Sequence, residues 1–240
     1  MRAGPHEGAA VKAGRVAVVV RDSAHVVLRY AAALADRTPP GAWASGPGTP
    51  VVLIPGIWEP WRYLRPLGAR LHALGHPVHP VPALGLNGAD LESSADVVAA
   101  FLADNGLQGV VAVAHSKGGL IGKRLLLHPR AAPRLTGLVA LCTPFGGSRL
   151  ARRGLARTPL GLFHPTGAIL MALAAERTVN ARITSIGAAW DQVVPDGSHL
   201  DGARNITLSA AGHFRPVADA GVAALVHAEV ERLARERACG

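Results

Sequence analysis

A serine between small residues follows an apolar run in the middle of the chain. Residues 114–118 read Ala-His-Ser-Lys-Gly and come directly after the apolar run 109–113. A serine on a sharp strand-to-helix turn needs small neighbours, because larger side chains would collide with the adjoining strand or helix. Glycine is usual at the first small position, and Ala114 is still small. Ser116 is therefore predicted to be a nucleophile, with a helix N-cap as the alternative for so short a match.

Apolar runs and helical patterns alternate along the chain from residue 51 onward. Short apolar runs are typical of strands buried on both faces, and apolar residues at helical spacing indicate helices. The predicted strands are 51–54, 109–114, 135–142, 182–189 and 205–209, with a weaker one at 77–83. The predicted helices are 63–74, 90–105, 117–128 and 217–235. This alternation predicts an α/β fold, with a mainly parallel sheet covered on both faces and ligands at the carboxyl ends of its strands.

Residues 1–49 precede this alternation and are predicted to form an N-terminal extension. Residues 1–14 are expected to be frayed, 15–36 favour a helix, and 37–50 are a linker rich in Pro, Gly and Ser. For the run 16–20 within this segment, the pattern alone does not distinguish a helix from a strand. Residues 50–240 then form one domain.

The six residues at 114–119, Ala-His-Ser-Lys-Gly-Gly, resemble the nucleophile elbow of the α/β-hydrolase superfamily, particularly of its small bacterial lipases. The resemblance covers roughly 50–236. It implies an α/β-hydrolase fold and an oxyanion hole made by two backbone amides. Here these amides belong to Lys117 and to Ile57, within Pro55-Gly-Ile-Trp58. The family often has a histidine where this chain has Pro55. Because backbone amides rather than side chains stabilise the oxyanion, we expect the oxyanion hole to work without that histidine.

The resemblance also implies a base and an orienting carboxylate, in the chain order serine, acid, histidine. A serine hydroxyl is a weak nucleophile near neutral pH and needs both groups. Asp191 fits the middle place, because it ends the apolar run 183–190 and opens a segment similar to the family's acid loop. His213 fits the last place, after the predicted strand 205–209. A Ser116–His213–Asp191 triad is the resulting hypothesis.

Other acids and histidines stay open as alternatives. Asp196 or Asp201 could replace Asp191 as the acid. The competitors of His213 are His199, in a polar segment, and His227, within the predicted final helix. His213 is preferred because its place after a strand suits a catalytic loop.

Two basic side chains adjoin the nucleophile. His115 is expected to pack rather than catalyse, because neighbouring residues on a turn point in different directions. The amide of Lys117 is the part that the chemistry needs, although its charge could sit at the mouth of the site. No metal is expected at His72, His76 and His79, which straddle a Gly-Pro break without nearby carboxylates.

Apolar residues beyond the turn could hold an acyl group. Trp58 and Trp61 lie just after the oxyanion segment, with core packing as the alternative. Phe145 belongs to Thr143-Pro-Phe-Gly-Gly-Ser148, which resembles the point where the chain of lipase-like members leaves the sheet for a lid. Residues 146–178 are therefore predicted to be a short lid insertion with an apolar surface and a basic rim, and a plain packing helix is the alternative. The apolar residues include Leu155, Phe163 and Met171, and the basic ones are Arg149, Arg152, Arg153 and Arg157.

Composition narrows the class of protein. A chain of 240 residues that is 49% hydrophobic can bury the core of one domain. Its early run 16–20 is far shorter than the about 20 apolar residues of a membrane span. Residues 1–14 lack the apolar segment of a signal peptide, so a cytoplasmic protein is expected, with secretion as an alternative.

The net charge of +9 comes almost wholly from arginines scattered along the chain. No basic run is interleaved with aromatic residues, so no nucleic-acid partner is expected, and contact with an anionic lipid surface stays an alternative. The only cysteines are Cys142 and Cys239, which predict neither a disulfide framework nor a thiolate metal site. No cofactor is expected.

These observations together predict an esterase or lipase that cleaves carboxylic esters with a hydrophobic acyl group through an acyl-enzyme. The substrate would be a small-molecule ester or lipid. An acyltransferase is the nearest alternative, because the same residues would serve if an alcohol replaced water. The alternative from another class of protein is a basic interaction module, which has the same fold but catalyses no reaction.

Overall fold

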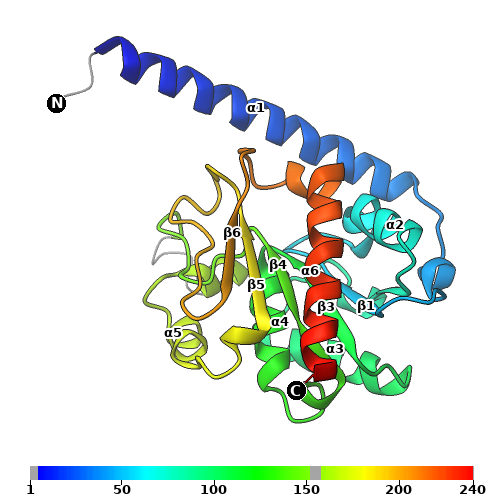
Figure 1. The fold of residues 1–240 in the computed structure, drawn as a ribbon. Helices are drawn as coiled ribbons and strands as arrows, with labels where there is room; N and C mark the ends of the chain where they lie inside the picture. Colours follow the sequence, from blue (N-terminus) through cyan, green and yellow to red (C-terminus); the bar gives the residue numbers. More distant parts are fainter. Residues whose placement is uncertain (1–4, 152–157, 240) are drawn as a thin grey trace.

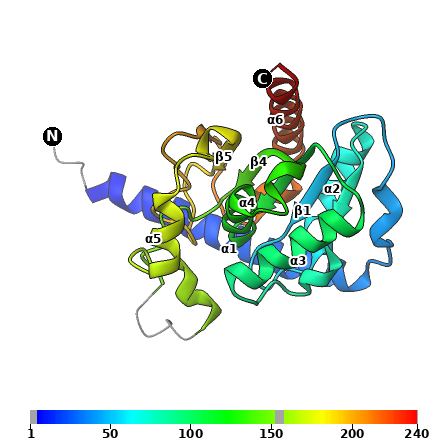
Figure 2. The ribbon, with the colours of Figure 1, turned by 90° about the horizontal axis from the view of Figure 1, so that it is seen from below.

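Six strands form one sheet in the order β2-β1-β3-β4-β5-β6. The computed structural model describes residues 5–151 and 158–239, and within these residues all pairings of the sheet are parallel. Figures 1 and 2 show helices on both faces of the sheet. The predicted α/β fold with a doubly wound parallel sheet is confirmed.

The strands lie where apolar runs predicted them. They are β1 (Val51–Ile54), β2 (Val78–Pro80), β3 (Val110–His115), β4 (Leu135–Leu141), β5 (Ile183–Gly187) and β6 (Arg204–Thr207). Every residue of β1, β3 and β4 is buried, as expected of central strands covered on both faces. The strand order reverses between β1 and β3, because β2 lies on the far side of β1. Ligands bind at such a switch point in open α/β sheets.

The helices also follow their predicted segments closely. They are α1 (Pro5–Ala35), α2 (Arg65–Ala73), α3 (Leu91–Asp104), α4 (Lys117–Leu127), α5 (Ala168–Ala175) and α6 (Ala220–Cys239). Short 3-10 helices occupy Pro40–Trp43, Trp61–Leu64, Pro82–Leu84, Ala132–Arg134, Pro159–Phe163, Asn180–Arg182 and Arg215–Ala218. At the start of α3, the Asp90 carboxylate accepts a hydrogen bond from the Ser93 amide at 2.8 Å. Asp90 thus acts as the N-cap of α3.

Two apolar cores lie on the two faces of the sheet. Successive residues of a strand point to opposite faces. Val52 and Ile54 of β1 therefore join the core under α3 and α4, while Val51 and Leu53 join the core under α2 and α6. In Figure 2, α3 and α6 are seen on opposite sides of the central strands.

Helix α1 lies along one end of the body, and its N-terminal part extends past it (Figure 1). The helix begins at Pro5, so the prediction of a frayed start is wrong for residues 5–14. Proline suits the first turn of a helix, and Ala9 and Ala10 are strong helix formers. None of the helices in residues 5–151 and 158–239 is long and apolar enough to cross a membrane.

Substituting Gly118 with alanine should destabilise the protein. A Cβ atom at Gly118 would lie 2.2 Å from the Ile54 carbonyl oxygen, because α4 passes close over the end of β1. Overpacking of this kind costs about 1–3 kcal/mol in the free energy of unfolding. Urea denaturation of Gly118→Ala measures this loss. Gly146→Ala is the control, since no heavy atom lies within 4 Å of its added Cβ. Equal stability of the two variants would contradict the close approach.

Candidate active site

Ser116 occupies a strained turn between β3 and α4. Its backbone has φ 52° and ψ −122°, a region in which a residue other than glycine costs about 1–3 kcal/mol. The Ser116 amide donates to the Leu141 carbonyl at 2.9 Å, and the Thr143 hydroxyl donates to the Ser116 carbonyl at 3.0 Å. No side-chain capping bond is formed by Ser116 within the described residues. The turn is held by its neighbours, and the N-cap alternative does not describe it.

The small residues around Ser116 are required by close packing. Ala114 is buried and pairs with Ile54 on one side and Ala140 on the other. A Cβ atom at Gly119 would come within 2.0 Å of the Thr143 hydroxyl oxygen. The sheet and α4 therefore leave no room for larger side chains at this turn, which is the constraint inferred from the sequence.

His213 and Asp191 form a buried hydrogen-bonded pair. His213 Nδ1 lies 2.7 Å from Asp191 Oδ2, and because a carboxylate only accepts, Nδ1 carries the proton. In the tautomer that is protonated on Nδ1 alone, Nε2 is the basic atom. Asp191 Oδ1 accepts from the amides of Val193 and Val194, both at 2.7 Å. These bonds fix the carboxylate against the imidazole.

The charged form of Asp191 is favoured despite its burial. Burial alone would raise the pKa of this carboxyl. The hydrogen bond and charge of His213, followed by the amides of Val194 and Val193, outweigh burial and hold the pKa of Asp191 below its ordinary value. An ionised carboxylate is the form that can orient an imidazole and stabilise its protonated state.

The alternative acids and histidines lie elsewhere. Asp196 pairs with Arg149, and Asp201 pairs with Arg177 and His199. The remaining competitor, His227, contacts His76, with 2.8 Å between His227 Nδ1 and His76 Nε2. Asp191 and His213 bond to one another, and His213 lines the same cavity as Ser116, whereas none of the alternative acids and histidines lines it.

Ser116 and His213 open onto one cavity of about 420 Å³. Its size is within the range of small-molecule pockets. Trp58 and Phe163, two of the residues expected to bind substrate, line it, as do residues of the predicted lid insertion. The other apolar lining residues are Val26, Ile57, Pro144, Leu150, Ala151, Leu160, Val193, Val194 and Phe214. A largely apolar chamber thus surrounds the serine and the imidazole.

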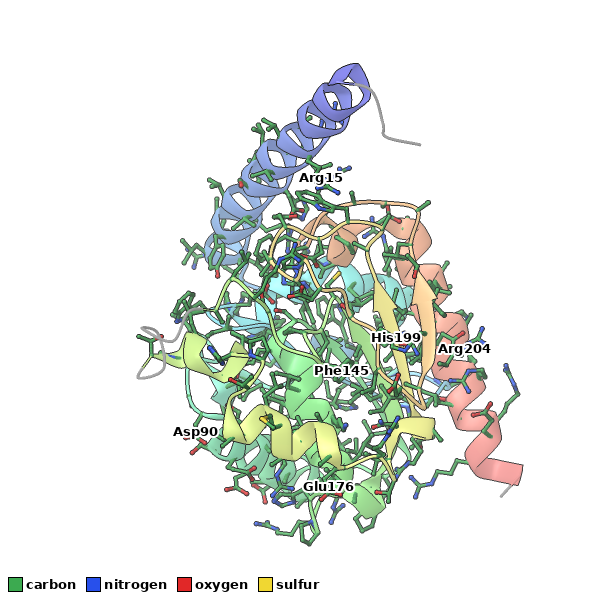
Figure 3. The ribbon with its side chains drawn as sticks, turned by 90° about the vertical axis from the view of Figure 1, so that its left-hand side faces the viewer. Arg15, Asp90, Phe145, Glu176, His199 and Arg204 are labelled. Carbon is green, nitrogen blue, oxygen red and sulfur yellow. The ribbon has the colours of Figure 1, made fainter. Side chains whose placement is uncertain are left out.

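Three residues expected to bind substrate do not line this cavity. Trp61 is buried against Trp43, with ring centroids 6.2 Å apart, so its alternative as a core residue holds. Phe145 is buried in the core under α3 and α4, and Figure 3 places it inside the body. Met171 on α5 is 56% exposed. An apolar residue type alone does not indicate whether its side chain lines a cavity, packs in the core or is exposed.

The segment 146–178, which is predicted to be a lid insertion, contains the 3-10 helix Pro159–Phe163 and helix α5. Leu150, Ala151 and Leu160 bring its apolar surface to the cavity. Of the predicted basic rim, Arg149 pairs with Asp196 at 3.2 Å. Leu155, Arg152, Arg153 and Arg157 lie outside the described residues.

The two amides expected to form the oxyanion hole flank the serine. Ile57 follows β1 and lines the cavity, and Lys117 is the first residue of α4. The first amides of a helix have no partner within the helix. Within the described part of the chain, no hydrogen bond occupies the amide of Ile57 or of Lys117. An oxyanion role for these two amides requires such unpaired donors and stays a prediction.

The side chain of Lys117 turns away from the cavity. It is buried, and its ammonium donates to the Asn87 carbonyl at 2.9 Å and also to the Ala89 carbonyl. Burial lowers the pKa of Lys117 to about 8, against the raising influence of Asp90. The prediction that the charge of Lys117 could lie at the mouth of the site is therefore wrong, because its ammonium is hydrogen-bonded to the carbonyls of Asn87 and Ala89.

His115 joins the segment after β1 to the loop that carries His213. Its Nδ1 lies 2.9 Å from Glu59 Oε1, and its Nε2 lies 3.0 Å from the His213 carbonyl. Both partners only accept, so both ring nitrogens carry protons. Burial alone would lower the pKa of His115, but the Glu59 carboxylate and the His213 carbonyl raise it. Glu59 also accepts from the Gly56 amide at 2.7 Å, which fixes the segment that carries Ile57.

Sequence reasoning missed the contribution of α1 to the cavity. Val26 and Tyr30 of this helix line it, although they lie in the predicted N-terminal extension. One signal was present: Asp22 is the only acidic residue in the otherwise apolar and basic stretch 16–35. An acid in such a stretch needs a partner, but the pattern does not say where.

Two groups of possible metal ligands occur among the described residues. One comprises Cys142, Asp191 and His213, and the other His76, His227 and Glu231. The first holds the hydrogen-bonded pair itself, and burial keeps the pKa of the Cys142 thiol well above its ordinary value. In the second, His76 Nδ1 meets the Thr49 carbonyl and its Nε2 meets His227, so neutral tautomers satisfy these contacts.

Comparison with solved structures identifies the fold. A monoacylglycerol lipase of Paleococcus ferrophilus matches with a TM-score of 0.58 at 16% identity, over 78% of this chain and 96% of its own. A lipase of Bacillus licheniformis in mature form matches with a TM-score of 0.60 at 15% identity, over 78% of this chain and 92% of the lipase. Mouse alpha/beta hydrolase domain-containing protein 10 matches with a TM-score of 0.57 at 14% identity, over 80% of this chain and 91% of the mouse protein.

No family model matches the sequence, and no curated protein does so. The structural likeness nevertheless extends over most of each neighbour. The chain has the α/β-hydrolase fold, as the turn around Ser116 predicted. At identities of 14–16% the likeness defines the fold, and the reaction has to be argued from the site.

The stability that Asp191 contributes should depend on pH. Its pKa is lower in the folded protein than in the unfolded chain, where it is about 3.9. The contribution is therefore present above about pH 4 and is lost as the pH falls through the folded value. We expect the difference in unfolding free energy between wild type and Asp191→Asn to shrink below about pH 4, measured by urea denaturation.

Asp201→Asn provides the matched control, because the Asp201 side chain is 69% exposed and its ion pairs are screened by water. Its stability should stay close to that of wild type throughout the titration. A wild-type advantage over Asp191→Asn that stays constant from neutral pH to pH 2 would contradict the assignment.

Proposed function

We propose that this protein is a serine hydrolase that cleaves carboxylic esters with a hydrophobic acyl group. One observation carries the proposal: Ser116, on a strained strand-to-helix turn, shares an apolar cavity with His213, whose other ring nitrogen is bound to Asp191. A nucleophile, a base and an orienting carboxylate on three segments are the parts that two-step acyl transfer needs.

In the first step, His213 Nε2 accepts the proton of the Ser116 hydroxyl as Oγ attacks the ester carbonyl carbon. The carbonyl oxygen becomes an oxyanion, which the amides of Ile57 and Lys117 stabilise. Each such donor is worth on the order of 10²–10³ in turnover. When the tetrahedral intermediate collapses, the C–O bond to the alcohol breaks and protonated His213 returns the proton to the leaving oxygen.

In the second step, water attacks the acyl-enzyme and gives its proton to His213. Collapse of the second intermediate releases the carboxylic acid and restores Ser116. Asp191 stabilises the protonated imidazole in both steps without taking a proton itself. The apolar lining around Phe163 and Trp58 supports a hydrophobic acyl group, because polar groups entering it would lose water without gaining partners.

A fluorophosphonate probe tests this proposal directly. Wild type should be labelled stoichiometrically, and Ser116→Ala should not be labelled, because the phosphorus is captured by the serine oxygen. The variant should also lose about 10⁴-fold or more in kcat on an ester substrate. Thermal unfolding is the control for folding, since removal of one hydroxyl leaves the turn's backbone bonds in place.

A series of p-nitrophenyl esters of increasing acyl length then measures specificity. We expect kcat/KM to rise from acetyl to longer chains, since the cavity is apolar. Product analysis with added short alcohols distinguishes hydrolysis from acyl transfer. Absence of labelling, together with salt-dependent binding to anionic vesicles or nucleic acid, would replace the proposal with a non-catalytic interaction module.

A further inference from the structure

The buried carboxylate of Asp22 lies at the junction of the two catalytic loops. Asp22 belongs to α1 and has no exposed surface. It accepts hydrogen bonds from the backbone amides of His213 at 2.8 Å, Phe214 at 3.1 Å and Arg215 at 2.9 Å. Three consecutive amides thus converge on one carboxylate.

The same carboxylate also binds the loop of the acid. The side-chain amide of Gln192, the residue after Asp191, donates to Asp22 Oδ2. Asp22 therefore contacts the segments that carry both members of the Asp191–His213 pair. Gly212, which has φ +110°, makes room for it, because a Cβ atom there would lie 2.8 Å from Asp22 Oδ1.

Further contacts extend along the same side of α1. The Arg15 guanidinium lies over the Trp190 ring, 5.4 Å from its centroid, immediately before Asp191 in the chain. Figure 3 places Arg15 on α1 near the loops at that end of the body. At the other end, the Tyr30 hydroxyl donates to the Trp58 carbonyl at 2.6 Å, next to Ile57. One helix thus contacts the acid loop, the histidine loop and the oxyanion segment.

A purely structural anchor would not need a carboxylate at this position. A buried charge is costly unless hydrogen bonds satisfy it, and apolar side chains would attach the helix with less cost. The donors that satisfy Asp22 come from the loops of the catalytic pair. The cost of burial is therefore offset only when those loops hold the conformation seen here.

We propose that Asp22 is a positioning residue for catalysis, and that α1 is a working part of the active site. By holding the amides of 213–215, Asp22 fixes the backbone that aims the His213 imidazole at Ser116. This inference rests on the proposed hydrolase function. Small misplacements of reacting groups reduce rates strongly, so the effect should appear in turnover rather than in substrate binding.

The isosteric variant Asp22→Asn tests this role. Its amide nitrogen would face backbone N–H groups, so the cluster loses at least one acceptor. With a p-nitrophenyl ester that wild type hydrolyses, we expect kcat to fall about 10- to 100-fold while KM changes less than about threefold. Fluorophosphonate labelling should slow in parallel. Ser23→Ala, at the exposed neighbouring position of α1, is the matched control and should keep wild-type kinetics.

Two readouts that do not use turnover separate positioning from stability. Amide hydrogen exchange at 213–215 should become faster in Asp22→Asn, while exchange in β3 and β4 stays unchanged. The downfield NMR signal of the His213 Nδ1 proton, bonded to Asp191, should shift or broaden. These measurements use the isosteric variant Asp22→Asn. They therefore report on the loop even if the truncated variant Asp22→Ala fails to fold.

The two hypotheses fail in different ways. If wild type is not labelled by the probe, the proposed function is wrong, and the catalytic role of Asp22 falls with it. If wild type is labelled and Asp22→Asn keeps wild-type kcat and wild-type exchange at 213–215, only the inference about Asp22 is overturned.

Discussion

The close approach of α4 to the sheet is the constraint on which the site depends. Gly118 and Gly119 bring the start of the helix so near to β1 and to Thr143 that Ser116 is held at a positive φ. The same approach places the first residue of α4 directly after Ser116, which lines the cavity, and the Lys117 side chain lies inside the body. The strain at Ser116 is stored by packing on both sides, and without it the turn would relax into an ordinary helix start.

Most of the fold could be predicted, because local patterns specify its elements. Buried runs such as 51–54 and 135–141 are too short and too apolar for helices, and the Asp90 cap marks the start of α3. Alternation of these elements then leaves few topologies other than a parallel sheet. The start of α1 was misplaced, because Gly8 and Gly14 interrupt residues 5–14 and no apolar stripe at helical spacing marks that stretch.

The candidate site could be predicted only in part. The segments that carry Ser116, Asp191 and His213 could be expected to lie together, because each follows a strand and strand ends meet at one edge of a parallel sheet. Trp61, Phe145 and Met171 were misplaced, since an apolar side chain does not reveal which wall it joins. The role of α1 could not be foreseen either. The bond from the His213 amide to Asp22 joins residues 191 positions apart, and no local pattern encodes such a contact.

That separation also bears on how the molecule assembles. Contacts between residues far apart in sequence carry a large loop-closure cost and tend to form late. Asp22 is synthesised before its partners at 213 and 215, which follow it by 191 and 193 positions. Asp191 and His213 are therefore expected to reach their final geometry late in folding, when α1 docks on the loop at 213–215. A chain interrupted before residue 213 would hold Ser116 without the imidazole that shares its cavity.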